Sequence, residues 1–174
     1  MISSKLEARI NEQINKEMYS AYLYMGMSAY MSGKGYKGAA SWLMVQYHEE
    51  MFHAMKLYSH LQDRGARVEL KALAAPAVKE PAFRELFVQV LEHEKAVTAS
   101  IRELLELAIS EKDYAAENLI RWYADEQVEE ERNVEEILQE IDLMGNSAQG
   151  LFLLNVELGK RGLSVPSDFT KLGA

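Results

Sequence analysis

Long uninterrupted helical segments are the feature that most limits the fold of this chain of 174 residues. Its three prolines stand at positions 76, 81 and 166, and between the glycine-containing turns apolar residues recur at mixed steps of three and four. That spacing is typical of amphipathic helices, and the segments are rich in the strong helix formers Ala, Leu, Met, Glu and Lys. The sequence therefore predicts an all-α fold.

Four main helices and a short fifth one are expected. The predicted ranges are about 4–32, 36–64, 81–111 and 113–144 for the main helices, and about 147–160 for the fifth. Ser4 suits an N-cap, Pro81 suits a first helical turn, and Gly65 and Gly145 suit helix ends. Main helices of about 28 to 32 residues would each be roughly 42 to 48 Å long, which favours a bundle.

The lengths of the connections predict how the helices run. The turns after the first and third helices are only a few residues long, so those helix pairs should be antiparallel. The second and third helices are separated by about 16 residues, GARVELKALAAPAVKE, which could reach roughly 50 Å when extended. A connection of that length can travel back along the bundle. We therefore expect one long crossover, with the second and third helices parallel.

Composition limits the domain count and the classes of function. The whole chain, 1–174, is expected to form one domain: a bundle over about 4–144, the fifth helix, and a tail at 161–174. Cysteine is absent, which excludes disulfides, thiolate metal sites and cysteine nucleophiles, so any metal site must use O and N ligands. The net charge of −8 argues against nucleic acid as the main partner and favours the attraction of cations.

The first twenty residues mix charges with apolar residues at helical spacing. They contain no unbroken apolar stretch, so they resemble neither a signal peptide nor a membrane span. A cytoplasmic protein with no membrane partner is the expectation.

Each main helix carries a polar interruption near the middle of its core-facing row of side chains. This row, called the seam below, is traced by alternating steps of three and four residues. The interruptions are, in chain order, Glu17; Gln46, Glu50 and His53; Glu94; and Gln127 and Glu130. Helices of matched length that pack side by side bring their midpoints to one level. These polar side chains are therefore expected to meet.

Metal ions explain such a meeting better than water does. A single seam Glu more often reaches water at a helix edge, but four at one level disfavour that interpretation. Four carboxylates converging in an apolar bundle would each cost roughly several kcal/mol if left unneutralised. Two divalent cations would balance them. Di-iron and di-manganese bundles use a Glu from each of two helices and Glu-x-x-His from the other two. Glu50 and His53 form that motif, whereas Gln127 and Glu130 depart from it.

Other polar residues lie near these positions. Tyr24 is two turns from Glu17 on the same face; a seam tyrosine is more often a core residue, although its hydroxyl could face the metals. Three carboxylates flank the seam and could form an acidic approach: Glu49, Glu126 and Glu129. Three histidines do not lie at the central level of the seam and are expected to have surface or packing roles: His48, His60 and His93.

Nearly the whole chain resembles a bacterial non-haem ferritin. The stretches that carry the resemblance are NEQINKEMYSAYLYMGMSAY, GAASWLMVQYHEEMFHAMKLYSHLQDRGARV, LEHEKAVTASIRELLELA and WYADEQVEEE, and they occur in the family's order. The resemblance implies a ferritin-like four-helix bundle with one long crossover between helices two and three.

The resemblance also implies roles for the polar residues. Glu17, Glu50 and His53 would bind a first iron, with Glu50 bridging to a second. The second iron would be held by Glu94 and Glu130, with Gln127 as a weak ligand or a neighbour of the ligands. Tyr24 would hydrogen-bond near the centre and supply an electron. A third iron site would use Glu49, Glu126 and Glu129, with Glu130 shared.

The implied activity is oxidation of Fe²⁺ by dioxygen or hydrogen peroxide. Hard oxygen donors with few nitrogens stabilise Fe(III) relative to Fe(II), and two neighbouring irons can deliver two electrons to one oxidant. The resemblance further implies a homo-oligomeric 24-subunit shell that stores the oxidised iron as a ferric oxyhydroxide mineral. The negative charge would draw Fe²⁺ through channels, one of them lined by the fifth helix.

Three alternatives compete with the ferritin interpretation. A haem-containing bacterioferritin is the nearest one, because Met51 stands in a position like that family's haem-ligating methionine; the Gln127 and Glu130 pair argues against it. Rubrerythrin-type peroxidases usually carry a module that requires cysteines, which this chain lacks. A structural helical oligomer without redox turnover belongs to a different class, and oxidation of added Fe²⁺ distinguishes it.

Overall fold

The computed structural model describes residues 2–169, so residue 1 and the end of the expected tail, 170–174, lie outside the described residues. Five α-helices and no strand occur in the described part. Their bounds are Ser4–Gly33 (α1), Lys37–Asp63 (α2), Phe83–Ser110 (α3), Tyr114–Met144 (α4) and Ala148–Leu158 (α5). The all-α prediction is confirmed, with each helix within three residues of its expected bounds. None of the helices in the described range is long and apolar enough to cross a bilayer.

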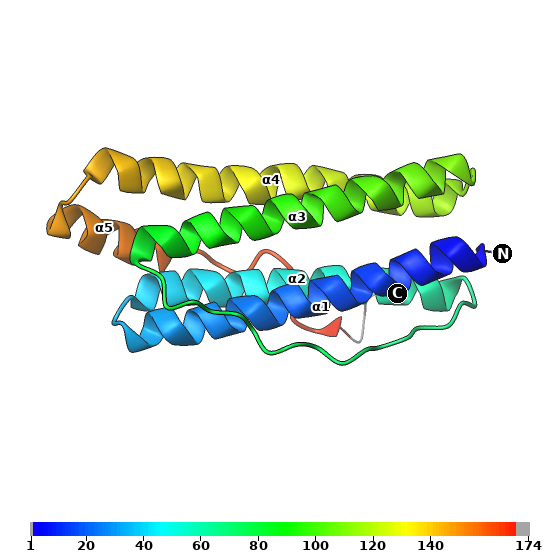
Figure 1. The fold of residues 1–174 in the computed structure, drawn as a ribbon, viewed down its shortest axis with the longest axis horizontal. Helices are drawn as coiled ribbons and strands as arrows, with labels where there is room; N and C mark the ends of the chain where they lie inside the picture. Colours follow the sequence, from blue (N-terminus) through cyan, green and yellow to red (C-terminus); the bar gives the residue numbers. More distant parts are fainter. Residues whose placement is uncertain (1, 170–174) are drawn as a thin grey trace.

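The four main helices form a bundle of two antiparallel pairs (Figure 1). α1 packs against α2, and α3 packs against α4. The extended connection at 64–82 returns along the outside of α1 to the other end of the bundle, so α2 and α3 run parallel. The expected single crossover is therefore present. α5 lies across the end of the bundle where α3 begins, in contact with α2 and α4.

Side-chain caps set most of the helix starts. The Ser3 hydroxyl accepts a hydrogen bond from the Leu6 amide at 3.1 Å, so Ser3 and not Ser4 is the N-cap of α1. Asp113 and Ser147 cap α4 and α5 in the same way. Pro81 does not join α3 as expected, because its carbonyl accepts a hydrogen bond from the Tyr30 hydroxyl at 3.0 Å and the helix begins two residues later.

Two asparagines on α1 hold the crossover against the bundle. Asn11 accepts from the Glu69 amide at 2.7 Å and donates to the Arg67 carbonyl at 2.8 Å. Asn15, one turn later, accepts from the Lys71 amide at 2.7 Å and donates to the Glu69 carbonyl at 2.8 Å. The backbone of the extended segment thereby finds the partners that a neighbouring strand would otherwise supply.

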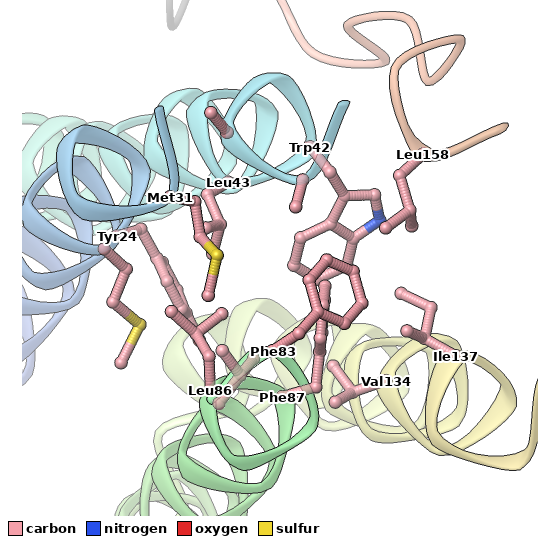
Figure 2. Close-up of a cluster of buried hydrophobic side chains, with 14 of the residues drawn as sticks. Tyr24, Met31, Trp42, Leu43, Phe83, Leu86, Phe87, Val134, Ile137 and Leu158 are labelled. Atoms are coloured by element: carbon pink, nitrogen blue, oxygen red, sulfur yellow. The ribbon is translucent and has the colours of Figure 1, made fainter. Parts of the chain in front are cut away.

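The apolar core is divided into two clusters by a polar layer. The cluster toward α5 includes Trp42 and Phe87, whose ring centroids are 5.6 Å apart. Figure 2 shows Trp42 of α2 lying between Leu158 of α5 and Phe83 of α3. The other cluster, on the opposite side of the polar layer, includes Leu6, Leu57 and Ile101. Each buried side chain of this size contributes about 1.5–3 kcal/mol, which holds the helices in register around the layer.

Candidate metal centre

The polar layer, called the waist below, consists of the seam interruptions of all four main helices. Its members are at most 4% exposed: Glu17, Gln46, Glu50, His53, Glu94, Gln127 and Glu130. The expectation that these side chains are buried at the middle of their helices is therefore correct. Tyr24 is also fully buried beside them. Their meeting follows from helices of similar length packed with their ends aligned (Figure 1).

Three waist residues come close enough to hold one metal ion. One ligand atom from each of Glu17, Glu50 and His53 lies within 4.8 Å of the others, the single such group found among residues 2–169. Within the same residues, Oε2 of Glu17 and both carboxylate oxygens of Glu50 are buried without a hydrogen-bond donor. Buried carboxylate oxygens almost always have a partner. These three acceptors, facing an imidazole, fit the donor set of a hard divalent cation.

The second half of the waist is centred on Glu94. The Tyr24 hydroxyl donates to one oxygen of Glu94. The side-chain amide of Gln127 lies 3.2 Å from the other oxygen and 3.3 Å from the Thr98 hydroxyl oxygen. Glu130, across the bundle, accepts a hydrogen bond from Gln46 at 2.8 Å. Glu94 and Glu130 are thus held by amide and phenol donors.

Burial and mutual repulsion change the acidity of these carboxyl groups. Burial, followed by the charges of Glu94 and Glu17, raises the pKa of Glu50 well above its ordinary value. Burial raises the pKa of Glu94 to about 7, although the hydrogen bond from Tyr24 acts in the opposite direction. Burial and the charge of Glu94 raise the pKa of Glu130 to about 7. The waist therefore favours binding of positive charge, whether protons or metal ions.

Burial also keeps Tyr24 protonated. It raises the pKa of this phenol well above 10, with a further contribution from the negative charge of Glu94. The hydroxyl consequently stays a hydrogen-bond donor toward Glu94 throughout the neutral range.

Sequence reasoning missed the residues that orient Glu17. The amide of Gln13 donates to Glu17 at 2.9 Å, and the Ser100 hydroxyl donates to the amide oxygen of Gln13 at 2.6 Å. Lys16 in turn donates to the Ser100 hydroxyl at 2.8 Å. Gln13 stands one helical turn before Glu17, so a second polar residue on the same face was the available signal.

The three flanking carboxylates do not form a metal cluster in this structure. Glu129 is exposed and Glu126 is half-buried, whereas Glu49 is buried. Burial raises the pKa of Glu126, and the charges of Glu129 and Glu49 add to that rise. Glu49 is paired with Arg161 and accepts a further hydrogen bond from Ser164.

The remaining histidines lie away from the metal cluster, in agreement with their expected packing or surface roles. His93 is mostly buried, its Nε2 is 2.7 Å from the Ser20 hydroxyl, and its ring meets that of Tyr24 edge-on at 5.8 Å. Burial lowers its pKa to about 4, so it stays neutral. His48 stacks edge-on against Tyr47, and His60 is half-buried near the end of α2.

Known proteins resemble this chain over nearly its whole length. A family model for the ferritin-like domain matches residues 7–144. A probable bacterial non-haem ferritin-like protein of Haemophilus influenzae is 38% identical over 159 residues, which cover 91% of this chain and 96% of that protein. A bacterial non-haem ferritin of Staphylococcus aureus is 37% identical over 161 residues, covering 92% of this chain and 97% of its own length.

Solved structures give the same result. An open-pore ferritin from the hyperthermophilic archaeon Archaeoglobus fulgidus superimposes with a TM-score of 0.91 at 42% identity, covering 93% of this chain and 100% of that one. An engineered closed form of the same ferritin gives a TM-score of 0.92 over 94% of this chain and 100% of its own. Because the family match spans all four main helices and the relatives align over nine-tenths of the sequence, the chain belongs to the ferritin family.

Proposed function

We propose that this protein stores iron and oxidises it on entry. Two Fe²⁺ ions are the substrates, bound in the waist, and dioxygen or hydrogen peroxide is the oxidant. The observation that carries the proposal is the set of three donor-less oxygens of Glu17 and Glu50 beside the imidazole of His53. A divalent cation would coordinate these acceptors directly and neutralise their charge.

The ligands divide between two metal positions in this proposal. Glu17, Glu50 and His53 hold the first Fe²⁺, and Glu50 also reaches the second. Glu94 and Glu130 bind the second ion, with Gln127 adjacent to it. The Tyr24 hydroxyl holds Glu94 in place through its hydrogen bond. Because only one histidine contributes, the donors are mostly hard oxygens, which stabilise Fe(III) and make oxidation favourable.

The reaction balances with the groups present. Each Fe²⁺ gives one electron, so a bound pair reduces one dioxygen to hydrogen peroxide, which takes up two protons. Glu94 and Glu130, with pKa values of about 7, release protons when the metal displaces them. Those protons are available to the reduced oxygen. The Fe³⁺ then moves to a ferric oxyhydroxide mineral, with Glu49, Glu126 and Glu129 as a third iron position on the way.

Storage requires an enclosed space, and we propose a homo-oligomeric shell of 24 subunits. Support comes from α5, whose side chains Phe152, Leu153 and Val156 are 66%, 57% and 44% exposed in the single chain. An apolar face of this kind is typical of an interface between copies. The proposal agrees with the similarity to the open-pore ferritin and its closed form.

The test is oxygen-dependent oxidation by the assembled, metal-free protein. Anaerobic Fe²⁺ is mixed with dioxygen, and Fe³⁺ absorbance is followed by stopped flow. We expect oxidation well above the buffer rate in the natural protein and in Glu92→Gln, a matched control at an exposed position of α3. The oxidation rate of Glu94→Gln should fall to near that of the buffer alone. Equal rates in all three proteins would reject the proposal and favour a structural oligomer.

Two further measurements complete the test. Native mass spectrometry of the same sample should give the mass of the shell. The visible spectrum reports haem, since a Soret band would favour the bacterioferritin interpretation in which Met51 is a ligand.

A further inference from the structure

The segment that follows α5 covers the buried carboxylate of Glu49. Residues 159–164, called the C-terminal latch below, turn back from the end of α5 toward the middle of α2. Nη2 of Arg161 donates to one oxygen of Glu49 at 2.6 Å, and the Ser164 hydroxyl donates to the other at 2.7 Å. Both oxygens of Glu49 are therefore occupied by donors from the latch.

Arg161 is fixed on a third side as well. Its Nη1 donates to the amide oxygen of Gln46, and its guanidinium carbon lies 4.7 Å from the centroid of the Trp42 ring. Its side chain is 20% exposed and that of Glu49 is 7% exposed. A planar guanidinium carries five N–H donors in a rigid fork, so its edge can bond a carboxylate and an amide while its face lies on an aromatic ring. The guanidinium of Arg161 is thus fixed in place by several contacts, unlike a solvent-exposed side chain on the surface.

Gln46 links this cation to the metal centre. The same side chain whose oxygen accepts from Arg161 donates through Nε2 to Glu130 at 2.8 Å. Gln46 is completely buried, so its amide has little freedom to turn. Arg161 therefore fixes the orientation of the amide that holds Glu130, a proposed ligand of the second iron.

From these contacts we infer that Arg161 is the built-in counter-cation of Glu49, and that a third metal ion binds only by displacing it. The inference deepens the proposed function and rests on it. A cation arriving at Glu49 meets oxygens that already carry two donors, and it must remove the guanidinium before it can coordinate them. The third position is consequently weak compared with the waist, where the oxygens of Glu50 have no donor.

This exchange has a functional consequence. A weak third position releases its ion readily, so iron passes through it and does not remain. When the ion leaves, Arg161 returns and again neutralises Glu49. The hydrogen bond from Arg161 to the Gln46 amide oxygen re-forms at the same time, and that amide donates to Glu130. Arg161 is in this sense a positioning residue, acting on the waist through Gln46.

Zn²⁺ binding to the assembled metal-free shell tests the inference without any oxidation. Zn²⁺ has no redox chemistry and accepts the same O and N ligands. The variant is Arg161→Gln, compared with Arg161→Lys and with Lys160→Gln, a neighbouring control whose ammonium pairs with exposed Glu157. Isothermal titration gives the number of ions per subunit and the affinity of each.

We expect two tight ions and one weak ion in the natural protein and in Lys160→Gln. Arg161→Gln should bind the third ion roughly tenfold more tightly, because no charged group has to be displaced. The affinity of Arg161→Lys for the third ion should lie between those of the natural protein and Arg161→Gln, because lysine keeps the positive charge but lacks the planar array of guanidinium N–H donors. An unchanged or weaker third affinity in Arg161→Gln overturns the inference. Failure of the first two ions to bind would instead reject the proposed function.

The fluorescence of Trp42 supplies a second readout that needs no variant of Arg161. The chain has two tryptophans, so Trp122→Phe leaves Trp42 as the one reporter. The first two Zn²⁺ equivalents should leave its emission unchanged. The third should shift the emission as the guanidinium leaves the ring. Emission that stays constant through the third equivalent would show that Arg161 does not move, and the inference would be wrong.

Discussion

The phenol of Tyr24 on α1 donates its hydrogen bond to the carboxylate of Glu94 on α3, and this buried contact helps to join the two helix pairs at the waist. A metal ion bound in the waist would interact with the same carboxylate of Glu94. Burial raises the pKa of Glu94 by more than this hydrogen bond lowers it, so the pKa is about 7.

Tyr24→Phe should therefore make Glu94 harder to ionise. Without the phenol donor its pKa rises above about 7, and Fe²⁺ has to displace a more firmly held proton. We expect the initial oxidation rate near pH 7 to fall by roughly threefold to tenfold, with the deficit shrinking at higher pH. Stopped-flow traces at several pH values measure this. Tyr30→Phe, whose hydroxyl bonds to Pro81 at 3.0 Å, is the control and should oxidise normally.

Replacing Glu50 with Leu should stabilise the metal-free protein while abolishing rapid oxidation. Neither oxygen of Glu50 has a hydrogen-bond donor, so the substitution removes a costly buried carboxylate and leaves no donor unpaired. We expect a gain of about 1–4 kcal/mol in the free energy of unfolding. Urea denaturation of the metal-free protein gives the value. Lower stability in Glu50→Leu would contradict the claim that the empty waist is unfavourable.

Glu94→Leu provides the comparison. It also removes a buried carboxylate, but it leaves the Tyr24 hydroxyl and the Gln127 amide without their acceptor. Each unsatisfied group costs roughly 1–3 kcal/mol. Its gain in stability should accordingly be smaller than that of Glu50→Leu, and it should also fail to oxidise Fe²⁺ rapidly.

The stability of the metal-free protein should fall as the pH rises from about 4.5 to about 7. Glu94 and Glu130 have folded-state pKa values of about 7, above the ordinary value of 4.5. A raised folded pKa means that the folded state binds more protons, so its stability is greatest below the unfolded pKa and is lost as the pH passes through the folded pKa. Thermal melts across this range measure the trend.

Two controls isolate the waist from the rest of the titrating surface. The double variant Glu94→Gln, Glu130→Gln should make the slope shallower, since neither of these groups can then ionise and only Glu50 of the waist, whose pKa is also raised, still contributes. Saturating Zn²⁺ should reverse it, because the metal binds the deprotonated carboxylates and competes with protons. A natural protein whose melting temperature rose steadily between about pH 4.5 and 7 would contradict the expectation.

Gly38→Ala should detach α5 from the bundle. A Cβ at position 38 would lie 1.5 Å from the backbone carbonyl oxygen of Asn155, which cannot move without shifting the helix. The amide of Ala39 would also lose its hydrogen bond to the Asn155 side chain. We expect normal helix content but a failure to assemble the shell, measured by circular dichroism and by size-exclusion chromatography.

Gly33→Ala is the matched control for that substitution. Position 33 ends α1, and a Cβ there would meet no atom within 4 Å. We expect assembly to be unaffected and stability to rise by about 0.5–1 kcal/mol, because alanine loses less backbone freedom on folding. Intact shells from both variants would show that α5 tolerates displacement at this contact.

Sequence reasoning succeeded where the information is local. Helix ranges follow from the spacing of apolar residues, and a polar interruption such as Glu94 stands out because its neighbours on the seam are apolar. Matched helix lengths then indicate that the interruptions meet. The same logic left the start of α3 wrong by two residues, since the bond from Tyr30 to Pro81 joins segments far apart in the chain.

The polar contacts around the waist could not be predicted from the spacing of apolar residues. Arg161 is 112 residues from Glu49 and lies in a tail with no periodic pattern, so nothing in the sequence indicates that the two pair. Gln46 was recognised as a polar seam residue, but its two partners come from α4 and from the latch. Long-range polar contacts depend on how loops return to the bundle, which hydrophobic spacing does not encode.

The grip of Asn11 and Asn15 on the crossover reaches only main-chain atoms. Side-chain identity between Glu69 and Ala75 therefore carries little of the attachment, provided that no proline removes a needed amide. In protein engineering this stretch is the natural place to rewrite: a peptide tag or a new binding sequence could replace those side chains while the two asparagines keep the path of the chain.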